Sequence, residues 1–278
     1  MSIINFTKLQ GNGNDFILID EMVEPVIPDD MKGQFSKCYC DRKFGIGGDG
    51  VLYISPSKIA DIRMRLFQPD SSEAEMCGNG IRCLAKYAFD HKYVNSNTIS
   101  IETLAGNLEV QVKYDENDVF LATVDMGNPI YESTQIPVNI KSKTGLPIVI
   151  DNIEVYVVNT GVPHAVIFVD DIKSVDINNI APKIRHNELF PNGINVNFVQ
   201  ITGKSSISIR TFERGVESET LSCGTGSTAS ALISTKVGKV SGSIVHVDTI
   251  GGPLDICVTP KITMTGAAET VYTGQIQF

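Results

Sequence analysis

The sequence contains no apolar run long enough to cross a membrane and carries no excess of positive charge. A run such as Ala165 to Val169 is short, whereas a membrane-spanning helix needs about 20 apolar residues. The residues from Met1 to Lys8 lack the basic start and apolar core of a signal peptide. The formal net charge of −9 repels nucleic acids and anionic membranes. These features predict a cytoplasmic protein that binds neither nucleic acid nor membrane.

The spacing of the cysteines excludes the usual zinc sites. None of the six cysteines belongs to a C-x2-C pair, and no His follows at the distance of a zinc ligand. Disulfide frameworks are typical of small secreted domains, and a chain of 278 residues is not small. No Lys lies in a recognisable pyridoxal-phosphate setting. We therefore expect no metal, no cofactor and reduced thiols, with Cys38, Cys40, Cys83 and Cys257 as small buried hydrophobic residues.

A short phrase that occurs twice is the most informative feature that the sequence does contain. Its copies are Cys77-Gly78-Asn79-Gly80 and Cys223-Gly224-Thr225-Gly226. They precede two predicted helices, Ile81 to Asp90 and Ser227 to Lys236. Free N–H groups and the positive end of the dipole favour anions at a helix N-terminus. A thiol there is expected to lose its proton more readily than its usual pKa of about 8.5 indicates.

The repeat extends beyond these phrases. Arg65-Leu66-Phe67-Gln68 precedes the first Cys much as Arg210-Thr211-Phe212-Glu213 precedes the second. Each half is predicted to contain two strands, a helix, two strands, the Cys-Gly turn, a second helix and further strands. The shared order of elements favours a duplication.

This order predicts an α+β protein of two pseudo-symmetric domains. Few helices are expected among many strands joined by short turns, so each domain is predicted to be a curved, mostly antiparallel, barrel-like sheet around a central helix. We expect an N-terminal domain of residues 1–124, to which a final strand of residues 270–278 returns. The second domain is expected to span residues 125–269, and the polar stretch Met126 to Lys143 fits the connection between the domains.

Two glycine-rich segments have competing interpretations. Gly45 to Gly50 formally matches the G-x-G-x-x-G pattern of dinucleotide sites, which requires a strand before it and a helix after it. Here Lys32 to Arg42 is predicted as a helix and Val51 to Ile54 as a strand, so we expect only a tight turn. Gly11 to Asp15 lies between two strands and is either a plain hairpin turn or part of a site. Taken alone, His164 is best interpreted as a surface residue. Taken alone, Glu213-Arg214 is best interpreted as a structural ion pair.

The two thiols together point to stereoinversion at carbon. A racemase removes a proton from one face of a carbon and returns a proton to the other face. A thiolate and a thiol on opposite sides of the substrate perform these two steps directly. Paired helix N-termini are suited to hold the substrate carboxylate and to stabilise the charge that develops on it.

Phrases in both halves make the chain resemble the diaminopimelate epimerase family, which needs no pyridoxal phosphate. The phrases run in the family order across nearly the whole chain. They are Lys8 to Phe16, Gly45 to Gly50, Ser72 to Cys83, Asn159 to His164, Phe190 to Asn197, and Glu213 to Gly215 followed by Cys223 to Gly226. Proline racemases share the fold and the pair of cysteines, but their flanking phrases match less well.

The resemblance implies inversion of the α-carbon of LL-2,6-diaminopimelate to the meso form, in lysine biosynthesis. It implies a homodimer and a cleft between two similar domains, with Cys77 and Cys223 as the two bases. His164 and Glu213 would assist proton movement. The remaining implied contacts are the reacting carboxylate on Gly78, Asn79, Gly224 and Thr225, the reacting amino group on Glu213 and the Arg214 backbone, and the distal end on Asn14, Asn195, the Arg214 guanidinium and the position of Gln68.

Three positions near the distal end depart from the family pattern. Gln68 stands where Asn is usual, Ser71 replaces a Gly, and Val162 replaces an Asn. A racemase of another amino acid with the same two cysteines is therefore the nearest alternative. A non-catalytic or isomerase relative that binds a small metabolite is a second alternative, although such relatives typically lack one or both cysteines.

Overall fold

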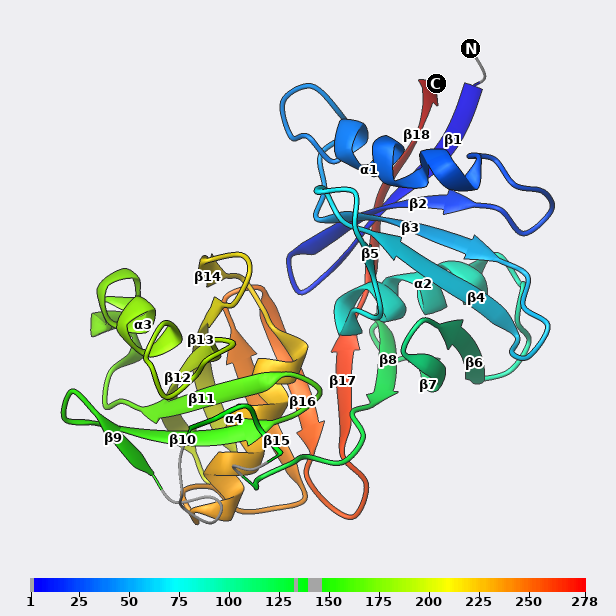
Figure 1. The fold of residues 1–278 in the computed structure, drawn as a ribbon. Helices are drawn as coiled ribbons and strands as arrows, with labels where there is room; N and C mark the ends of the chain where they lie inside the picture. The colour runs from blue at the N-terminus through cyan, green and yellow to red at the C-terminus, as the bar shows by residue number, and fades with distance from the viewer. Residues whose placement is uncertain (1–2, 133–134, 140–146) are drawn as a thin grey trace. The chain divides into compact units, whose positions relative to one another are not determined.

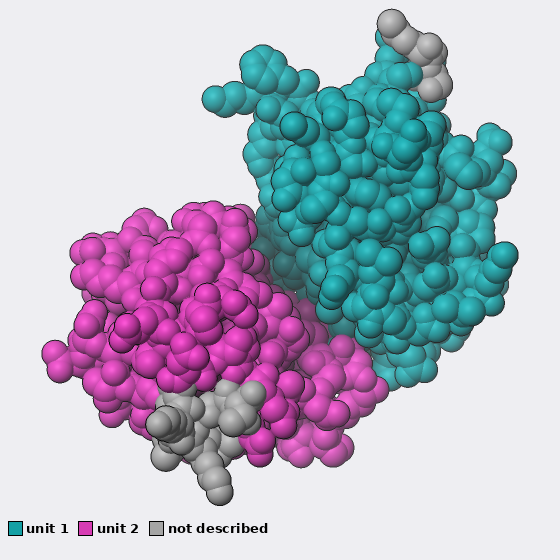
Figure 2. All heavy atoms as spheres, in the orientation of Figure 1, with its two compact units in different colours: residues 1–124, 265–278 teal, residues 125–264 magenta. Residues whose placement is uncertain are grey.

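The computed structural model describes residues 3–132, 135–139 and 147–278, so part of the stretch Met126 to Lys143 lies outside the described residues. The chain divides into two compact units (Figures 1 and 2). Unit 1 is Met1–Val124 with Thr265–Phe278, and unit 2 is Asp125–Met264. Across the described residues there are four α-helices and 18 strands, which confirms the predicted α+β class. None of the helices described is long and apolar enough to span a membrane.

Unit 1 is a sheet built around one long helix. The strand pairs β1–β2, β3–β4, β6–β7 and β7–β8 are antiparallel, while β2–β3 and β4–β6 are parallel. The final strand β18 returns to pair antiparallel with β1. The elements are β1 (Ile3–Gly11), β2 (Asn14–Asp20), α1 (Lys32–Tyr39), β3 (Gly50–Ser55), β4 (Ile62–Phe67), β5 (Glu73–Ala74), α2 (Gly78–Asp90), β6 (Thr98–Thr103), β7 (Gly106–Tyr114), β8 (Phe120–Asp125) and β18 (Glu269–Gln277).

Unit 2 repeats this order and its pairing. The pairs β10–β11, β12–β13 and β15–β16 are antiparallel, and β11–β12 and β13–β15 are parallel. Its short strand β14 pairs with β13 as β5 pairs with β4 in unit 1. The elements are β9 (Ile148–Ile150), β10 (Ile153–Asn159), β11 (Pro163–Phe168), α3 (Ile177–Arg185), β12 (Asn195–Gly203), β13 (Ser206–Glu213), β14 (Ser218–Thr220), α4 (Gly224–Lys236), β15 (Ile244–Thr249), β16 (Gly252–Cys257) and β17 (Thr263–Ala267), which ends in unit 1.

The helices α2 and α4 form the centres of the two units (Figure 1). α2 packs against β1, β2, β3, β4, β7 and β18, and α4 packs against β10 to β13, β15 and β16. Every residue of α4 from Gly226 to Ser234 is buried. A helix enclosed on all sides cannot keep a polar face, so most of its hydroxyls bond to its own backbone. Ser227, Thr228 and Ser230 donate to the carbonyls four residues earlier, whereas the buried hydroxyl of Ser234 has no partner among the described residues.

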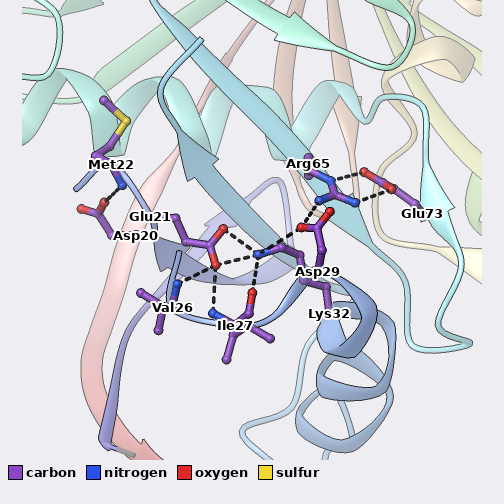
Figure 3. Close-up of polar contacts among 9 residues, drawn as sticks. All are labelled: Asp20, Glu21, Met22, Val26, Ile27, Asp29, Lys32, Arg65 and Glu73. Carbon is purple, nitrogen blue, oxygen red and sulfur yellow. Dashed lines mark hydrogen bonds and ion pairs between the residues drawn. The ribbon is translucent and has the colours of Figure 1, made fainter. Parts of the chain in front are cut away.

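Arg65 and Arg210 have the same surroundings in the two units. Arg65 Nε donates to Glu73 at 2.6 Å, and Arg210 Nε donates to Glu219 at 2.6 Å. Each pair joins two neighbouring strands immediately before a Cys-Gly turn. In unit 1 the Arg65 guanidinium also reaches Asp29 at 2.7 Å (Figure 3). These pairs hold the strands from which the turns start.

A buried ion pair anchors α1 to the sheet of unit 1. Lys32 is 2% exposed and Glu21 is 7% exposed, and Lys32 Nζ donates to both carboxylate oxygens at 2.6 Å. The backbone N–H groups of Val26 and Ile27 also donate to Glu21, each at 3.0 Å (Figure 3). Both charges are therefore compensated, as buried ions require.

The structure corrects the prediction for two of the cysteines. Cys40 and Cys83 are buried as expected, but Cys38 is exposed and Cys257 is half-buried. Cys38 was wrongly placed because it lies on the outer face of α1, where its sulfur accepts a hydrogen bond from the exposed Gln34. Cys257 ends β16 at the edge of the unit 2 core, where its thiol donates to the Thr259 carbonyl.

Candidate active site

Cys77 and Cys223 are the N-cap residues of the two central helices. Both have extended backbones, with φ of −144° and −130°. At the start of α4 the Gly226 N–H donates to the Cys223 thiol itself. Both helices begin at a Gly that follows the Cys, and the N-terminus of a helix favours bound anions. The repeated phrase thus builds the same local structure in both units.

In unit 1 the thiol of Cys77 faces the β1–β2 hairpin. Its Sγ lies 3.6 Å from Asn14 Oδ1, and Asn79 Nδ2 donates to the same oxygen at 3.3 Å. Asn14 Nδ2 donates to Asp49 Oδ2 at 2.5 Å. Asn79 Oδ1 is buried without a partner among the described residues. We call Cys77, Asn14, Asn79 and Asp49 the Cys77 site.

The two glycine-rich segments form the wall of the Cys77 site. Asn12 and Gly13 have φ of 54° and 79°, and Gly11 pairs with Asn14. The segment Gly11 to Asp15 is therefore a hairpin turn, and its first strand residue Asn14 also reaches the thiol. The segment Gly45 to Gly50 is the turn between α1 and β3, as predicted. It places Asp49 within hydrogen-bond distance of Asn14.

In unit 2 the thiol of Cys223 lies between a hydroxyl and a carboxylate. Thr225 Oγ1 is 3.4 Å from Cys223 Sγ. Burial and the neighbouring Glu213 carboxylate, to which the thiol donates, raise the pKa of Cys223, while the Thr225 hydroxyl and the Gly226 N–H lower it. The expectation of an acidic thiol is wrong for Cys223, because the helix end does not offset burial beside a negative charge. Cys223 is therefore a thiol at neutral pH in this structure.

His164 is fully buried behind Thr225. Its Nε2 lies 2.9 Å from Thr225 Oγ1, and its Nδ1 lies 3.1 Å from Asn197 Nδ2. Burial and the Arg214 cation lower the pKa of His164 to about 3. The interpretation as a surface His is wrong, because β11 directs this side chain beneath the N-terminus of α4. His164 is a neutral imidazole at neutral pH.

Asn195 and Arg214 meet at the ends of β12 and β13. Asn195 Oδ1 accepts a hydrogen bond from Arg214 N at 2.8 Å, and Asn195 Nδ2 donates to Pro163 O at 3.0 Å. The Arg214 guanidinium donates to Asn192 O at 3.3 Å and is half-buried. Glu213, next to Arg214, accepts from Thr220 at 2.7 Å. We call Cys223, Thr225, His164, Glu213, Asn195 and Arg214 the Cys223 site.

The three positions that depart from the family pattern lie in turns. Gln68 is exposed in the turn between β4 and β5, where its backbone N–H donates to Ser72 O at 2.8 Å. Ser71 has φ of 76°, a conformation that favours glycine. Val162 is half-buried between β10 and β11, and its carbonyl accepts from Thr160 at 3.2 Å.

Three polar residues that hold the site, Asp49, Asn197 and Thr211, were not predicted from the sequence. Asp49 contacts Asn14, and Asn197 contacts His164 and accepts a hydrogen bond from Thr211 at 3.0 Å. The role of Asn197 could have been predicted from its position in the sequence. Alternate residues of a strand share a face, so Asn197 lies on the same face of β12 as Asn195, between apolar neighbours. Among the described residues, no group of three His, Cys, Asp or Glu side chains is arranged to hold a metal ion.

The comparison with known proteins decides the family. The model of the family described as diaminopimelate epimerase matches residues 6–132 and 156–278. The chain belongs to the diaminopimelate epimerase family. Diaminopimelate epimerase of Methanothrix thermoacetophila is 53% identical over 277 residues, which cover 99% of this chain and 97% of that protein. The enzyme of Methanocella arvoryzae is 49% identical over 279 residues, with coverage of 99% and 98%.

Solved structures with lower identity share the fold of this family member. A phenazine biosynthesis protein of the PhzF family from Bacillus anthracis superposes with a TM-score of 0.72 at 17% identity and covers all of both chains. A probable proline racemase from Agrobacterium radiobacter K84 gives a TM-score of 0.65 at 17% identity, with coverage of 99% of this chain and 93% of its own. At this identity the similarity shows the architecture of two sheet-wrapped helices.

Proposed function

We propose that this protein is an isomerase that inverts the α-carbon of LL-2,6-diaminopimelate to give meso-diaminopimelate, a reaction of lysine biosynthesis. The observation that carries the proposal is the pair of cysteines at the N-caps of the two central helices. Relatives named diaminopimelate epimerase match nearly the full chain at up to 53% identity.

The reaction we propose uses one thiolate and one thiol. One cysteine takes the α-proton from one face of the substrate while the other cysteine gives its proton to the opposite face. The two residues thereby exchange protonation states, and no co-reactant is consumed. The raised pKa of Cys223 fits its role as the acid in one direction. In the other direction Glu213, which already accepts a hydrogen bond from this thiol, supports its action as the base.

The substrate is proposed to bind through both carboxylates. The reacting carboxylate would accept hydrogen bonds from the N–H groups at Gly78, Asn79, Gly224 and Thr225, which stabilise the developing negative charge. The Glu213 carboxylate and the Arg214 backbone would hold the reacting amino group. The distal end would meet Asn14, Gln68, Asn195 and the Arg214 guanidinium, since Arg suits a carboxylate.

The contacts around the Cys223 site refine the distal part of this proposal. Both ends of the Asn195 amide are already bonded within the protein. We therefore infer that Asn195 acts mainly by holding the Arg214 backbone in place. Within the Cys223 site, the Arg214 guanidinium carries the charge needed to bind a second carboxylate.

A racemase of another amino acid is the second candidate. The hydrophobic side chain at Val162 and the longer amide at Gln68 favour it, because both change the part of the site assigned to the distal end. Turnover of LL-diaminopimelate should exceed that of proline and histidine by at least about a hundredfold in kcat/KM, since both lack a second carboxylate to pair with the half-buried Arg214. Turnover of glutamate should also be lower, because its second carboxylate lies on a shorter chain. Faster turnover of any of the three would select the alternative.

We propose a cytoplasmic enzyme because its mechanism needs two reduced thiols, which reducing compartments maintain. We also propose a homodimer. Ile3, Val271 and Tyr272, on the neighbouring strands β1 and β18, are 65%, 55% and 44% exposed, and such apolar groups favour association. Sedimentation equilibrium should give twice the chain mass of 30.2 kDa, and a single chain mass at micromolar concentration would reject the dimer.

A further inference from the structure

We propose that Asn197 is a positioning residue that fixes which ring nitrogen of His164 carries the proton. Through this proton the hydroxyl of Thr225 is turned toward the sulfur of Cys223. The inference deepens the proposed epimerase function, and its consequence for turnover rests on that function. It is carried by five contacts within unit 2, three of them buried and two part-buried.

The orientation of the Asn197 amide follows from its partners. Asn197 Nδ2 lies 3.0 Å from the carbonyl oxygen of Ala165. A carbonyl only accepts hydrogen bonds, so the amino group of Asn197 must be on this side. The opposite end, Oδ1, accepts from Thr211 Oγ1 at 3.0 Å. Asn197 is 0% exposed and Thr211 is 2% exposed, so water does not compete for these bonds.

The amide in turn determines the tautomer of His164. The same Nδ2 atom lies 3.1 Å from His164 Nδ1. Because a donor faces it, Nδ1 must be the unprotonated nitrogen, and the proton of the neutral ring is on Nε2. Burial and the Arg214 cation keep the ring neutral. His164 is therefore held as one tautomer rather than as a mixture.

The proton on Nε2 sets the direction of the remaining bonds. His164 Nε2 donates to Thr225 Oγ1 at 2.9 Å, which leaves the hydroxyl hydrogen of Thr225 for Cys223 Sγ at 3.4 Å. Each hydrogen bond in the series from Asn197 to the sulfur is then donated in the direction of the sulfur. A hydrogen bond aimed at a sulfur stabilises its thiolate form, so the chain favours the state in which Cys223 is a base.

The glycine at the fourth position of the second phrase, Gly226, leaves space for the side chain of Asn197. A Cβ atom on Gly226 would lie 2.4 Å from Asn197 Oδ1, which no structure tolerates without moving the amide. At the equivalent Gly80 of unit 1, a Cβ atom would meet only carbon atoms, the closest being Leu52 Cδ2 at 3.3 Å. The two copies of the phrase thus keep the same glycine for different reasons.

Nitrogen-15 NMR of the imidazole rings tests the tautomer without any substrate. The protein contains four His, and His164→Gln identifies the signal of His164. We expect the wild-type ring to be protonated at Nε2 only and to stay so from pH 8 to pH 5. In Asn197→Asp the new carboxylate accepts from Nδ1, so Nδ1 becomes protonated and the ring titrates at a higher pH. Protonation of wild-type Nδ1, or an unchanged tautomer in Asn197→Asp, would overturn the proposal.

The glycine pair provides a matched control for this measurement. Gly226→Ala displaces Asn197 and should abolish the single tautomer of His164. Gly80→Ala adds the same methyl group at the equivalent place in unit 1 and should leave the His164 signals unchanged. Equal effects of the two substitutions on the His164 ring would contradict the assignment.

The alkylation rate of Cys223 tests the link to the thiol. The rate is followed for the peptide that contains Cys223 during reaction with iodoacetamide at fixed pH. Thr225→Val should lower it about tenfold, the effect of one hydrogen bond to a charged group. Thr228→Val removes a buried hydroxyl one turn along α4 that donates to Gly224 O, and should leave the rate unchanged. An unchanged alkylation rate in Thr225→Val would reject the link. If the rate falls as expected but the wild-type protein does not epimerise LL-diaminopimelate, only the proposed function is rejected.

The pH profile of turnover separates positioning from a structural role. In Asn197→Asp, kcat should fall as pH rises through the new pKa of His164, because the neutral ring then offers Nε2 as an acceptor to Thr225 and withdraws the hydroxyl from the sulfur. A uniform fall in kcat at every pH would indicate a structural role alone and overturn the proposal.

Discussion

Asn14 donates a hydrogen bond from its side-chain amide to Asp49 Oδ2 at 2.5 Å. Because a carboxylate only accepts, this contact turns the amide oxygen of Asn14 toward the thiol of Cys77. A carbonyl orients Asn197 in unit 2 in the same way. The Cys77 thiol therefore contacts an amide of fixed orientation directly, and the Cys223 thiol is linked to one through Thr225 and His164. In each unit an acceptor-only group fixes the amide.

Removal of the Asp49 carboxylate should disorder the Cys77 site. In Asp49→Ala the Asn14 amide loses its fixed orientation, and we expect kcat/KM to fall about tenfold, as small displacements of positioned groups typically cause. Steady-state kinetics with LL-diaminopimelate measures this. The control is Asp41→Ala, in the same loop, where the carboxylate caps the N–H groups of Lys43 and Phe44. Equal losses in both variants would show that only the loop conformation matters.

The two N-cap cysteines should be indispensable and the exposed cysteine dispensable. Cys77→Ala and Cys223→Ala each remove an acid/base group, so epimerisation should fall by at least about a thousandfold. Cys38→Ala should retain full activity, because Cys38 is exposed on α1, and Cys83 and Cys257 should tolerate Ala apart from stability losses. Normal turnover in Cys223→Ala would end the two-base account.

The prediction from sequence succeeded for features that residues close together in the chain determine. The Cys-Gly-x-Gly phrase located both helix N-termini, although the helices begin three residues earlier than predicted, at Gly78 and Gly224. The arginines before it proved to be paired equivalents, Arg65 with Glu73 and Arg210 with Glu219. The predicted order around Gly45 to Gly50, a helix before it and a strand after it, is confirmed by α1 and β3. These signals are local in the chain, so a single sequence contains them.

The prediction failed where burial and distant neighbours decide. Nothing in the local sequence places Glu213 against Cys223, so the raised pKa of that thiol was not foreseen. Cys38 and Cys40 are two residues apart, yet only the geometry of α1 against the sheet makes the first exposed and the second buried. Asn197 was overlooked because its role depends on the parallel pairing of β11 and β12.

The stability of the protein should depend on the protonation of His164. Its pKa is about 3 in the folded protein and 6.5 as the reference, so the unfolded chain binds the proton more tightly. The contribution of His164 is complete above pH 6.5 and falls by about 1.4 kcal/mol per pH unit as the pH drops from 6.5 toward 3. Urea unfolding at pH 7, 6 and 5 measures the slope. His164→Gln should show a shallower slope, and an equal slope would contradict a buried neutral ring.

Ser71→Gly should raise the free energy of unfolding by up to about 1 kcal/mol. Ser71 has φ of 76°, where a side chain is strained and glycine is not. Urea unfolding measures the change. The control, Ser71→Ala, removes the hydroxyl but keeps the Cβ atom, so it should bring no gain. A stabilisation by Ala equal to that by Gly would reject backbone strain as the cause.

The buried pair of Lys32 and Glu21 should behave as a unit. Lys32→Met leaves the Glu21 carboxylate buried without its cation and should cost about 3–5 kcal/mol of stability. Adding Glu21→Gln should restore most of the loss, because an amide oxygen still accepts from the N–H groups of Val26 and Ile27. The control is Lys37→Met on the exposed face of α1, with a change below about 0.5 kcal/mol. A loss in the double variant equal to that in Lys32→Met would show that the charge of Glu21 is not the cause.

Isotope incorporation during the first few per cent of turnover tests the two-base mechanism most directly. The enzyme is given LL-diaminopimelate in heavy water, and product and remaining substrate are separated and analysed by mass spectrometry. Two cysteines acting from opposite faces predict deuterium at the inverted carbon of the product and almost none in the remaining substrate. Equal deuterium in both would mean that a single base returns protons to either face, which contradicts the account.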